Sequence, residues 1–122
     1  RNNMKYYGQI VFKGKGKIAS VTPIIKIKAW SKAMAKRRIA KKCDFILEGM
    51  ENYEIIWGVP KEYHARLIVS DKFGNKKLDN KKNHKAVSFE IAEFSMNLFK
   101  KTMAENPLSK LLGLKLELIW EE

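Results

Sequence analysis

The sequence has one cysteine, two histidines and no long apolar run, and each scarcity excludes a class of protein. A single cysteine, Cys43, rules out an internal disulfide framework and a cysteine-rich zinc module, and it favours a reducing cytoplasm. The uncharged apolar runs are a few residues long, far below the roughly 20 needed to cross a bilayer, so we expect no membrane-spanning segment. His64 and His84 have no acidic partner at a metal-ligand spacing, so we expect no metal and no cofactor.

The size and composition indicate one folded domain. The 122 residues can bury one hydrophobic core, and the 45% hydrophobic and 31% charged content differs from that of a disordered basic tail. We expect a single domain over 1–122, in which Arg1, Asn2 and Asn3 are an expression remnant ahead of Met4. No apolar stretch of suitable length follows Met4, so we expect no signal peptide.

Acidic residues are scarce in the first part of the chain. Residues 1–50 hold 13 basic and 2 acidic side chains, whereas residues 51–122 hold 12 basic and 11 acidic ones. No acidic residue precedes Asp44. A surface that carries mainly positive charge attracts a polyanion. Nucleic acid is the favoured partner; an anionic membrane or an acidic protein is the alternative.

Periodicity and turn residues predict the elements. Ser31 is a helix N-cap candidate, and Ala35, Ile39 and Cys43 begin an apolar stripe at helical spacing that continues to Met50. Asn106 and Pro107 end a second helix, for which a strand over 87–91 is the alternative. The predicted strands cover 6–12, 17–30 interrupted at Pro23, 53–59, 63–70 and 112–120; the helices cover 32–50 and 88–106; and a long polar loop covers 71–85 with a turn at Gly74.

The order of these elements predicts a β-rich α+β fold. If Pro23 splits the second strand, residues 5–70 follow the order of an oligonucleotide-binding (OB) fold, a β-barrel with an inserted helix, to which a C-terminal helix and strand are added. If Pro23 does not split it, an open ββαββαβ sandwich is equally natural. The apolar final strand can equally pair between subunits or close the barrel.

Basic residues interleaved with aromatic ones are typical of a groove for single-stranded nucleic acid, where lysines neutralise phosphates and rings stack on bases. Lys26 and Lys28 alternate with Trp30 along one strand, which favours Trp30 as a stacking residue. Trp57 and Cys43 are better explained as core residues. The predicted binding residues are Lys13, Lys15, Lys17, Lys26, Lys28, Lys32 and Arg37 for phosphates, and Trp30, Tyr6 and Tyr7 for bases.

The sequence carries no catalytic motif of the kinds expected for hydrolases or metalloproteases, so we predict no catalytic residues and no enzymatic activity. The alternative is a magnesium-dependent endonuclease acting on branched DNA. The stretch Leu78-Asp79-Asn80-Lys81 is similar to the Asp-Leu-Asp-Asn stretch of small phage-type Holliday junction resolvases. In this chain Lys77 stands at the first aspartate position, and a carboxylate cluster for magnesium is missing from the sequence pattern.

The opening Met4-Lys5-Tyr6-Tyr7-Gly8-Gln9-Ile10-Val11-Phe12, the length, and the bias toward Lys, Asn and Ile carry a further resemblance. Together they resemble the small early single-stranded-DNA-binding proteins of tailed phages that infect lactococci. The resemblance implies a modified OB-fold and sequence-tolerant binding of single-stranded DNA. It also implies self-association and support of phage replication and recombination in the host cytoplasm, with recombinase or replication proteins as partners.

Overall fold

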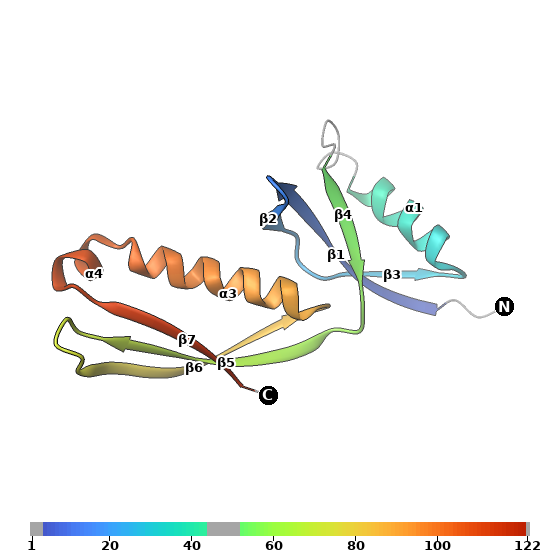
Figure 1. Ribbon diagram of the computed structural model, residues 1–122. Helices are drawn as coiled ribbons and strands as arrows, with labels where there is room; N and C mark the ends of the chain where they lie inside the picture. Colours follow the sequence, from blue (N-terminus) through green and yellow to red (C-terminus); the bar gives the residue numbers. More distant parts are fainter. Residues whose placement is uncertain (1–3, 44–51, 122) are drawn as a thin grey trace. The chain divides into compact units, whose positions relative to one another are not determined.

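The chain folds as two compact units (Figure 1). The computed structural model describes residues 4–43 and 52–121. Unit 1 comprises Arg1–Lys61 and Ala86–Ser88, and unit 2 comprises Glu62–Lys85 and Phe89–Glu122. Each unit pairs one antiparallel sheet with helical structure, so the predicted β-rich α+β class is confirmed.

The sheet of unit 1 is built around its first strand. The unit contains β1 (Met4–Gly14), β2 (Lys17–Val21), β3 (Ile25–Ala29), α1 (Lys32–Lys42) and β4 (Tyr53–Trp57). β2 and β3 follow one another along one edge of β1, and β4 pairs with the other edge. Between β2 and β3 the Thr22 amide donates to the Ile10 carbonyl at 3.0 Å, and Pro23, which lacks an N–H, follows. The predicted interruption at Pro23 is therefore confirmed.

Helix α1 begins where the sequence predicts. The Ser31 hydroxyl accepts a hydrogen bond from the Met34 amide at 3.2 Å, which satisfies one of the free donors of the first turn. Ala35, Ile39 and Cys43 lie buried on one side of the helix. Cys43 is a core thiol, as expected. The predicted continuation of this helix to Met50 falls outside the described residues.

The two faces of the unit 1 sheet differ in what covers them. On one face Ile10, Ile27 and Ala29 pack against α1. On the other face Gln9 is 3% exposed and joins two segments of chain. Its amide nitrogen donates to the Thr22 carbonyl at 2.8 Å, and its amide oxygen accepts from the Val87 amide at 3.0 Å. The short segment Ala86–Ser88 thereby belongs to unit 1.

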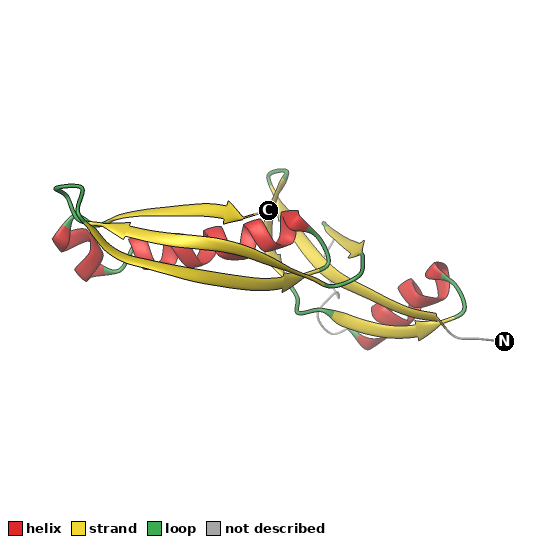
Figure 2. Ribbon diagram, turned by 90° about the horizontal axis from the view of Figure 1, so that it is seen from below, coloured by secondary structure: helices red, strands yellow, loops and turns green. Residues whose placement is uncertain are grey.

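Unit 2 contains the second sheet, which has three strands. Its elements are β5 (Lys61–Ser70), β6 (Lys76–Ala86), α3 (Phe89–Ala104), α4 (Pro107–Leu112) and β7 (Lys115–Glu121). The strand order is β6-β5-β7, and Figure 2 shows β7 and β6 along the two edges. Its buried residues come from β5 and α3: Ala65, Leu67, Val69, Ile91, Ala92 and Met96. The predicted second helix is confirmed, and so is the final strand from Lys115 onward, whereas Leu112 instead ends α4. The alternative strand over 87–91 is wrong.

The polar segment 71–85 is not a long loop, which corrects the prediction. Most of it is the edge strand β6, and only the turn at Gly74, where φ is +87°, agrees with the sequence interpretation. Asp71 organises that turn, because its carboxylate accepts from the Phe73 and Asn75 amides at 2.9 Å each. β6 lacks apolar alternation because residues 76–81 are exposed. β6 is hydrogen-bonded to β5 in the sheet, and side chains of β5 also bond to Asp79 and Asn83 of β6.

The two units have similar topologies. In each, a helical segment precedes the last strand, which pairs antiparallel with the first strand, so the first strand is central; unit 1 has two strands, β2 and β3, where unit 2 has β6. Neither sheet closes among residues 4–43 and 52–121, and β5 pairs with β6 and β7 rather than completing a barrel with β1. The OB-barrel interpretation is therefore not confirmed. None of the described helices has the length and apolar character required to span a membrane.

Candidate nucleic-acid interface

A basic patch of four side chains lies in unit 1, on the face of the sheet that α1 does not cover. In the β1–β3 ladder Lys5 lies opposite Lys28, and Tyr7 lies opposite Lys26. Residues paired across an antiparallel ladder point to the same face. The pair Tyr6 and Ile27, which lies between these two pairs, points to the other face, where α1 packs. The three lysines are exposed and Tyr7 is half-buried. We call these four residues the lysine face. The predicted residues Tyr7, Lys26 and Lys28 are thus brought together, and Lys5 joins them.

Trp30 follows directly on β3 and is the most exposed tryptophan described, at 57%. By comparison, Trp57 is half-buried in the core of unit 1, and Trp120 is half-buried with its ring 4.8 Å from that of Phe89. Next to Trp30, the Arg38 guanidinium donates to the Lys28 carbonyl, which ties α1 to the end of β3. The geometry leaves the Trp30 ring available to a ligand.

The predicted lysines of the β1–β2 turn form a separate basic group. Lys15 has φ +55° and Gly16 has φ +76°, which closes the turn tightly. Lys13 pairs with Glu54 at 3.0 Å across the β1–β4 ladder, and both side chains are largely exposed. Such an exposed ion pair contributes about 0–1 kcal/mol. Lys17 is exposed opposite Gly14.

Tyr6 lies on the opposite face from Tyr7. Its ring is half-buried against α1 and meets the Trp57 ring edge to face, with centroids 6.0 Å apart. A hollow of about 280 Å³ at the sheet margin is nevertheless lined by both tyrosines together with Lys5 and Lys32. Tyr6 therefore contributes to the core first and presents only part of its ring to the hollow.

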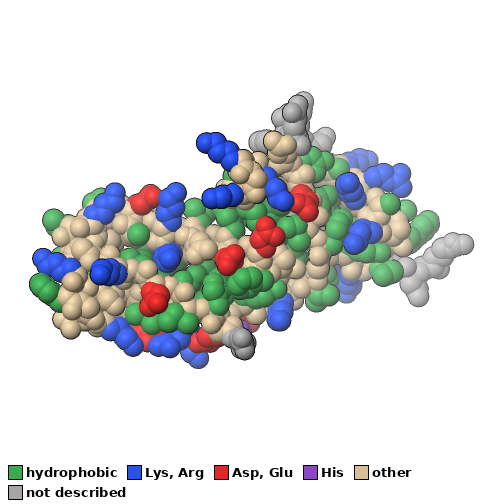
Figure 3. Space-filling view, in the orientation of Figure 1, with side chains coloured by type: hydrophobic (Ala, Val, Ile, Leu, Met, Phe, Trp, Pro, Cys, Tyr) green, Lys and Arg blue, Asp and Glu red, His purple; other side chains and the backbone are tan. Residues whose placement is uncertain are grey.

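Lys32 and Arg37 lie on the exposed side of α1, with the other basic residues of that helix: Lys36, Arg38, Lys41 and Lys42. The first turn of α1 contains no acidic residue, although an acidic side chain there would stabilise the helix. The surface over α1 shows basic side chains without acidic ones in the space-filling view (Figure 3). Within the described part of unit 1, Glu54 is the single acidic residue.

Asp79, the aspartate of the stretch that resembles a nuclease, is paired with two basic side chains. The Arg66 guanidinium hydrogen-bonds to both carboxylate oxygens of Asp79, and the Lys76 ammonium lies 3.0 Å from one of them. These bonds, Arg66 first, lower the pKa of Asp79 to about 2. Residues 4–43 and 52–121 contain no group of three potential metal ligands. His64 instead bonds Asn83, Nδ1 to Oδ1, at 2.6 Å.

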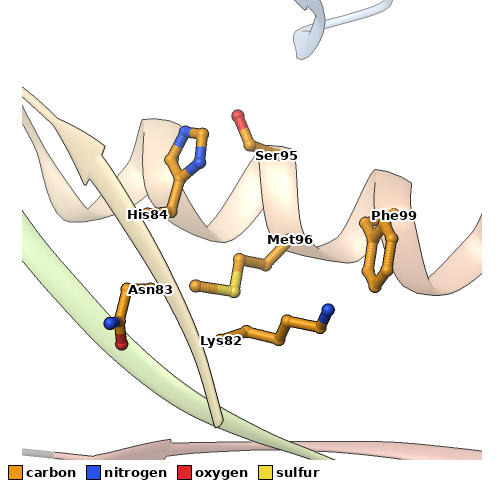
Figure 4. A pocket seen from close by; sticks show the side chains of 6 residues that line it. All are labelled: Lys82, Asn83, His84, Ser95, Met96 and Phe99. Atoms are coloured by element: carbon orange, nitrogen blue, oxygen red, sulfur yellow. The ribbon is translucent and has the colours of Figure 1, made fainter. Parts of the chain in front are cut away.

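A hollow that the sequence pattern does not predict lies in unit 2 between β6 and α3. Its volume is about 220 Å³, and Met96 forms its apolar floor (Figure 4). The Lys82 ammonium lies 4.8 Å from the centroid of the Phe99 ring, and Asn83, His84 and Ser95 complete the lining. Lys82 and His84 fall in the segment predicted as a loop, which is why the sequence pattern missed this hollow. It can accept a small planar or apolar group beside a cation.

Comparison with known proteins gives no relative: no family model, no curated protein and no solved structure matches the chain.

Proposed function

We propose that the protein binds single-stranded DNA without sequence preference and without catalysing a reaction, in support of phage DNA replication and recombination. The lysine face carries the proposal. Lys5 and Lys28 stand directly opposite each other, and like charges at such a pair destabilise a sheet. A phosphate between the two ammonium groups would turn this repulsion into attraction.

Tyr7 supports the choice of a single strand over a duplex. It occupies the next pair along the same face, about 7 Å from Lys5 along the strand. An unpaired base can stack on its ring while the neighbouring phosphates contact Lys26 and Lys28, and Trp30 offers a second ring beyond the end of β3.

The remaining basic groups extend the surface that a longer strand can follow. The turn lysines Lys13, Lys15 and Lys17 and the α1 residues Lys32 and Arg37 are exposed or largely exposed, and Glu54 is the sole described acidic residue of unit 1 that opposes them. This charge distribution favours phosphate contacts over an enzymatic site. The proposal also includes a homo-oligomeric state and an OB-type barrel, which additional strand pairing would have to close.

The test is a titration of a fluorescently labelled oligothymidylate with wild-type protein and with the double variant Lys26→Ala/Lys28→Ala, at several salt concentrations. For a single strand, each lost phosphate contact reduces the slope of log K against log salt by about 0.7. We expect the double variant to lose about 1.4 in slope. The matched control, Lys81→Ala/Lys110→Ala, removes two exposed lysines of unit 2 and should leave the slope unchanged. Equal slopes for the wild type and the double variant would reject the lysine face as the binding site.

A further inference from the structure

We infer that β7 is a dimerisation edge, at which two copies of the chain pair their β7 strands antiparallel and join two three-stranded sheets into one of six strands. Within the described part of the chain, β7 pairs only with β5, and its outer edge pairs with no other strand (Figure 2). The inference deepens the homo-oligomeric state included in the proposed function, and it does not depend on the binding of DNA.

The apolar side chains of β7 are less buried than those of the strand beside it. In the β5–β7 ladder Leu67 lies opposite Leu118, and Ala65 lies opposite Trp120. Leu67 and Ala65 are almost fully buried, whereas Leu118, Trp120 and Leu116 remain half-buried on the same face. An edge that leaves large apolar residues partly exposed invites another strand, whereas natural sheet edges are commonly protected by charge.

The other edge of this sheet carries such protection. β6 contains five lysines: Lys76, Lys77, Lys81, Lys82 and Lys85. Lysine on an edge strand opposes pairing with another strand. β7 has one lysine, Lys115, among its seven residues, and its other two charged side chains, Glu117 and Glu121, are acidic. The difference selects β7 as the open edge.

Charge selects a second copy of β7 as the occupant, in one register. When two β7 strands are paired about Leu118, Lys115 of each copy faces Glu121 of the other, and Leu116 faces Trp120. The register centred on Glu117 places the Glu117 carboxylates of the two copies directly opposite each other. The register centred on Ile119 places Glu117 opposite Glu121. Only pairing about Leu118 aligns all seven residues, gives two opposite-charge pairs and avoids directly opposed like charges.

The experiment measures self-association of the full chain by sedimentation velocity without nucleic acid, for the wild type, Lys115→Glu and Glu121→Lys. Each substitution places two like-charge pairs in its own homodimer, and we expect the dissociation constant to rise roughly tenfold or more. An equimolar mixture of the two variants forms opposite-charge pairs at both ends. We therefore expect the mixture to associate as tightly as the wild type.

The matched control is Lys110→Glu, which makes the same charge change on exposed α4 and should associate like the wild type. Circular dichroism of each variant verifies that it is folded. A wild-type protein that stays monomeric at high micromolar concentration overturns the inference. So does association that both variants retain, or a mixture no tighter than either variant alone, because each result places the contact away from β7.

Discussion

Lys5 and Lys28 lie directly opposite each other in the β1–β3 ladder, on the face of the sheet that α1 does not cover. A like-charge pair in this position lowers the stability of the free protein. The neighbouring pair, Tyr7 and Lys26, adds a third ammonium group and one ring. Such an arrangement is costly for the fold alone and becomes favourable when an anionic strand is bound.

This relationship predicts a conflict between stability and binding in Lys28→Glu. The new carboxylate faces the Lys5 ammonium, so unit 1 should gain roughly 0.2–1 kcal/mol in the free energy of unfolding. The same variant should bind single-stranded DNA more weakly. Urea titration measures the first effect and oligothymidylate anisotropy the second. Lys17→Glu, opposite Gly14, makes the same charge change without an opposing lysine and should not gain the cross-strand increment. A Lys28→Glu variant that binds as tightly as the wild type would contradict the account.

Tyr7 should contribute through its ring rather than through its hydroxyl. Replacing it with alanine removes the stacking surface and should weaken binding of a single strand by about 1–3 kcal/mol, whereas Tyr7→Phe should retain most of the affinity. Dissociation constants at fixed salt distinguish the two, and circular dichroism verifies the fold. If alanine and phenylalanine at this position bind equally well, Tyr7 does not stack on a base.

Gln9 should be a structural requirement of unit 1 and not a binding residue. Its side chain is buried and bonds the Thr22 carbonyl and the Val87 amide. In Gln9→Ala both backbone groups lose their partner, and each buried unsatisfied group costs about 1–3 kcal/mol. Urea unfolding should show a loss of a few kcal/mol, with the salt slope of DNA binding unchanged in the folded fraction. A loss below about 0.5 kcal/mol would mean that water or another group replaces Gln9.

Asp79 should support stability at neutral pH and lose this role in acid. The folded pKa of about 2 lies below the ordinary value of 3.8, so the ionised carboxylate favours the folded state above about pH 4. That contribution disappears as the pH falls from about 4 to about 2. The wild type should therefore be more stable than Asp79→Asn at pH 6, and the two should converge near pH 2. Identical pH profiles would show that the pairing with Arg66 and Lys76 does not stabilise the fold.

The sequence predicted the elements whose patterns are local. Ser31 as an N-cap, the interruption at Pro23 and the alternation of the last strand are set by backbone and side-chain rules that act over a few residues. The strand β6 was missed because both of its faces are largely exposed, so no alternation marks it. Helix α4 was also missed, although Asn106 caps it by accepting from the Leu108 amide at 2.9 Å and Pro107 is its first residue. The Asn-Pro pair marked a helix start as well as a helix end.

The sequence predicted the site only in part, because pairing between distant strands has no local signal. Lys26, Lys28 and Trp30 were grouped from alternation along one strand. Lys5 was not included, since its position opposite Lys28 depends on the β1–β3 register. Tyr6 and Tyr7 lie on opposite faces of the sheet because neighbouring side chains alternate along a strand, and this separation follows from the local pattern alone. The open β-sheet of unit 1 likewise follows from β5 pairing with β6 and β7 instead of with β1.

The most direct test of the account is the intrinsic tryptophan fluorescence of the wild type and of Trp30→Phe, titrated with a single-stranded oligonucleotide and with a duplex at low and physiological salt. We predict quenching by the single strand, weaker binding of the duplex, and loss of most of the quenching in Trp30→Phe, since Trp57 and Trp120 are half-buried. A folded protein whose fluorescence and salt response are unaffected by either nucleic acid would contradict the proposed function. It would also assign the basic surface of unit 1 to a different anionic partner.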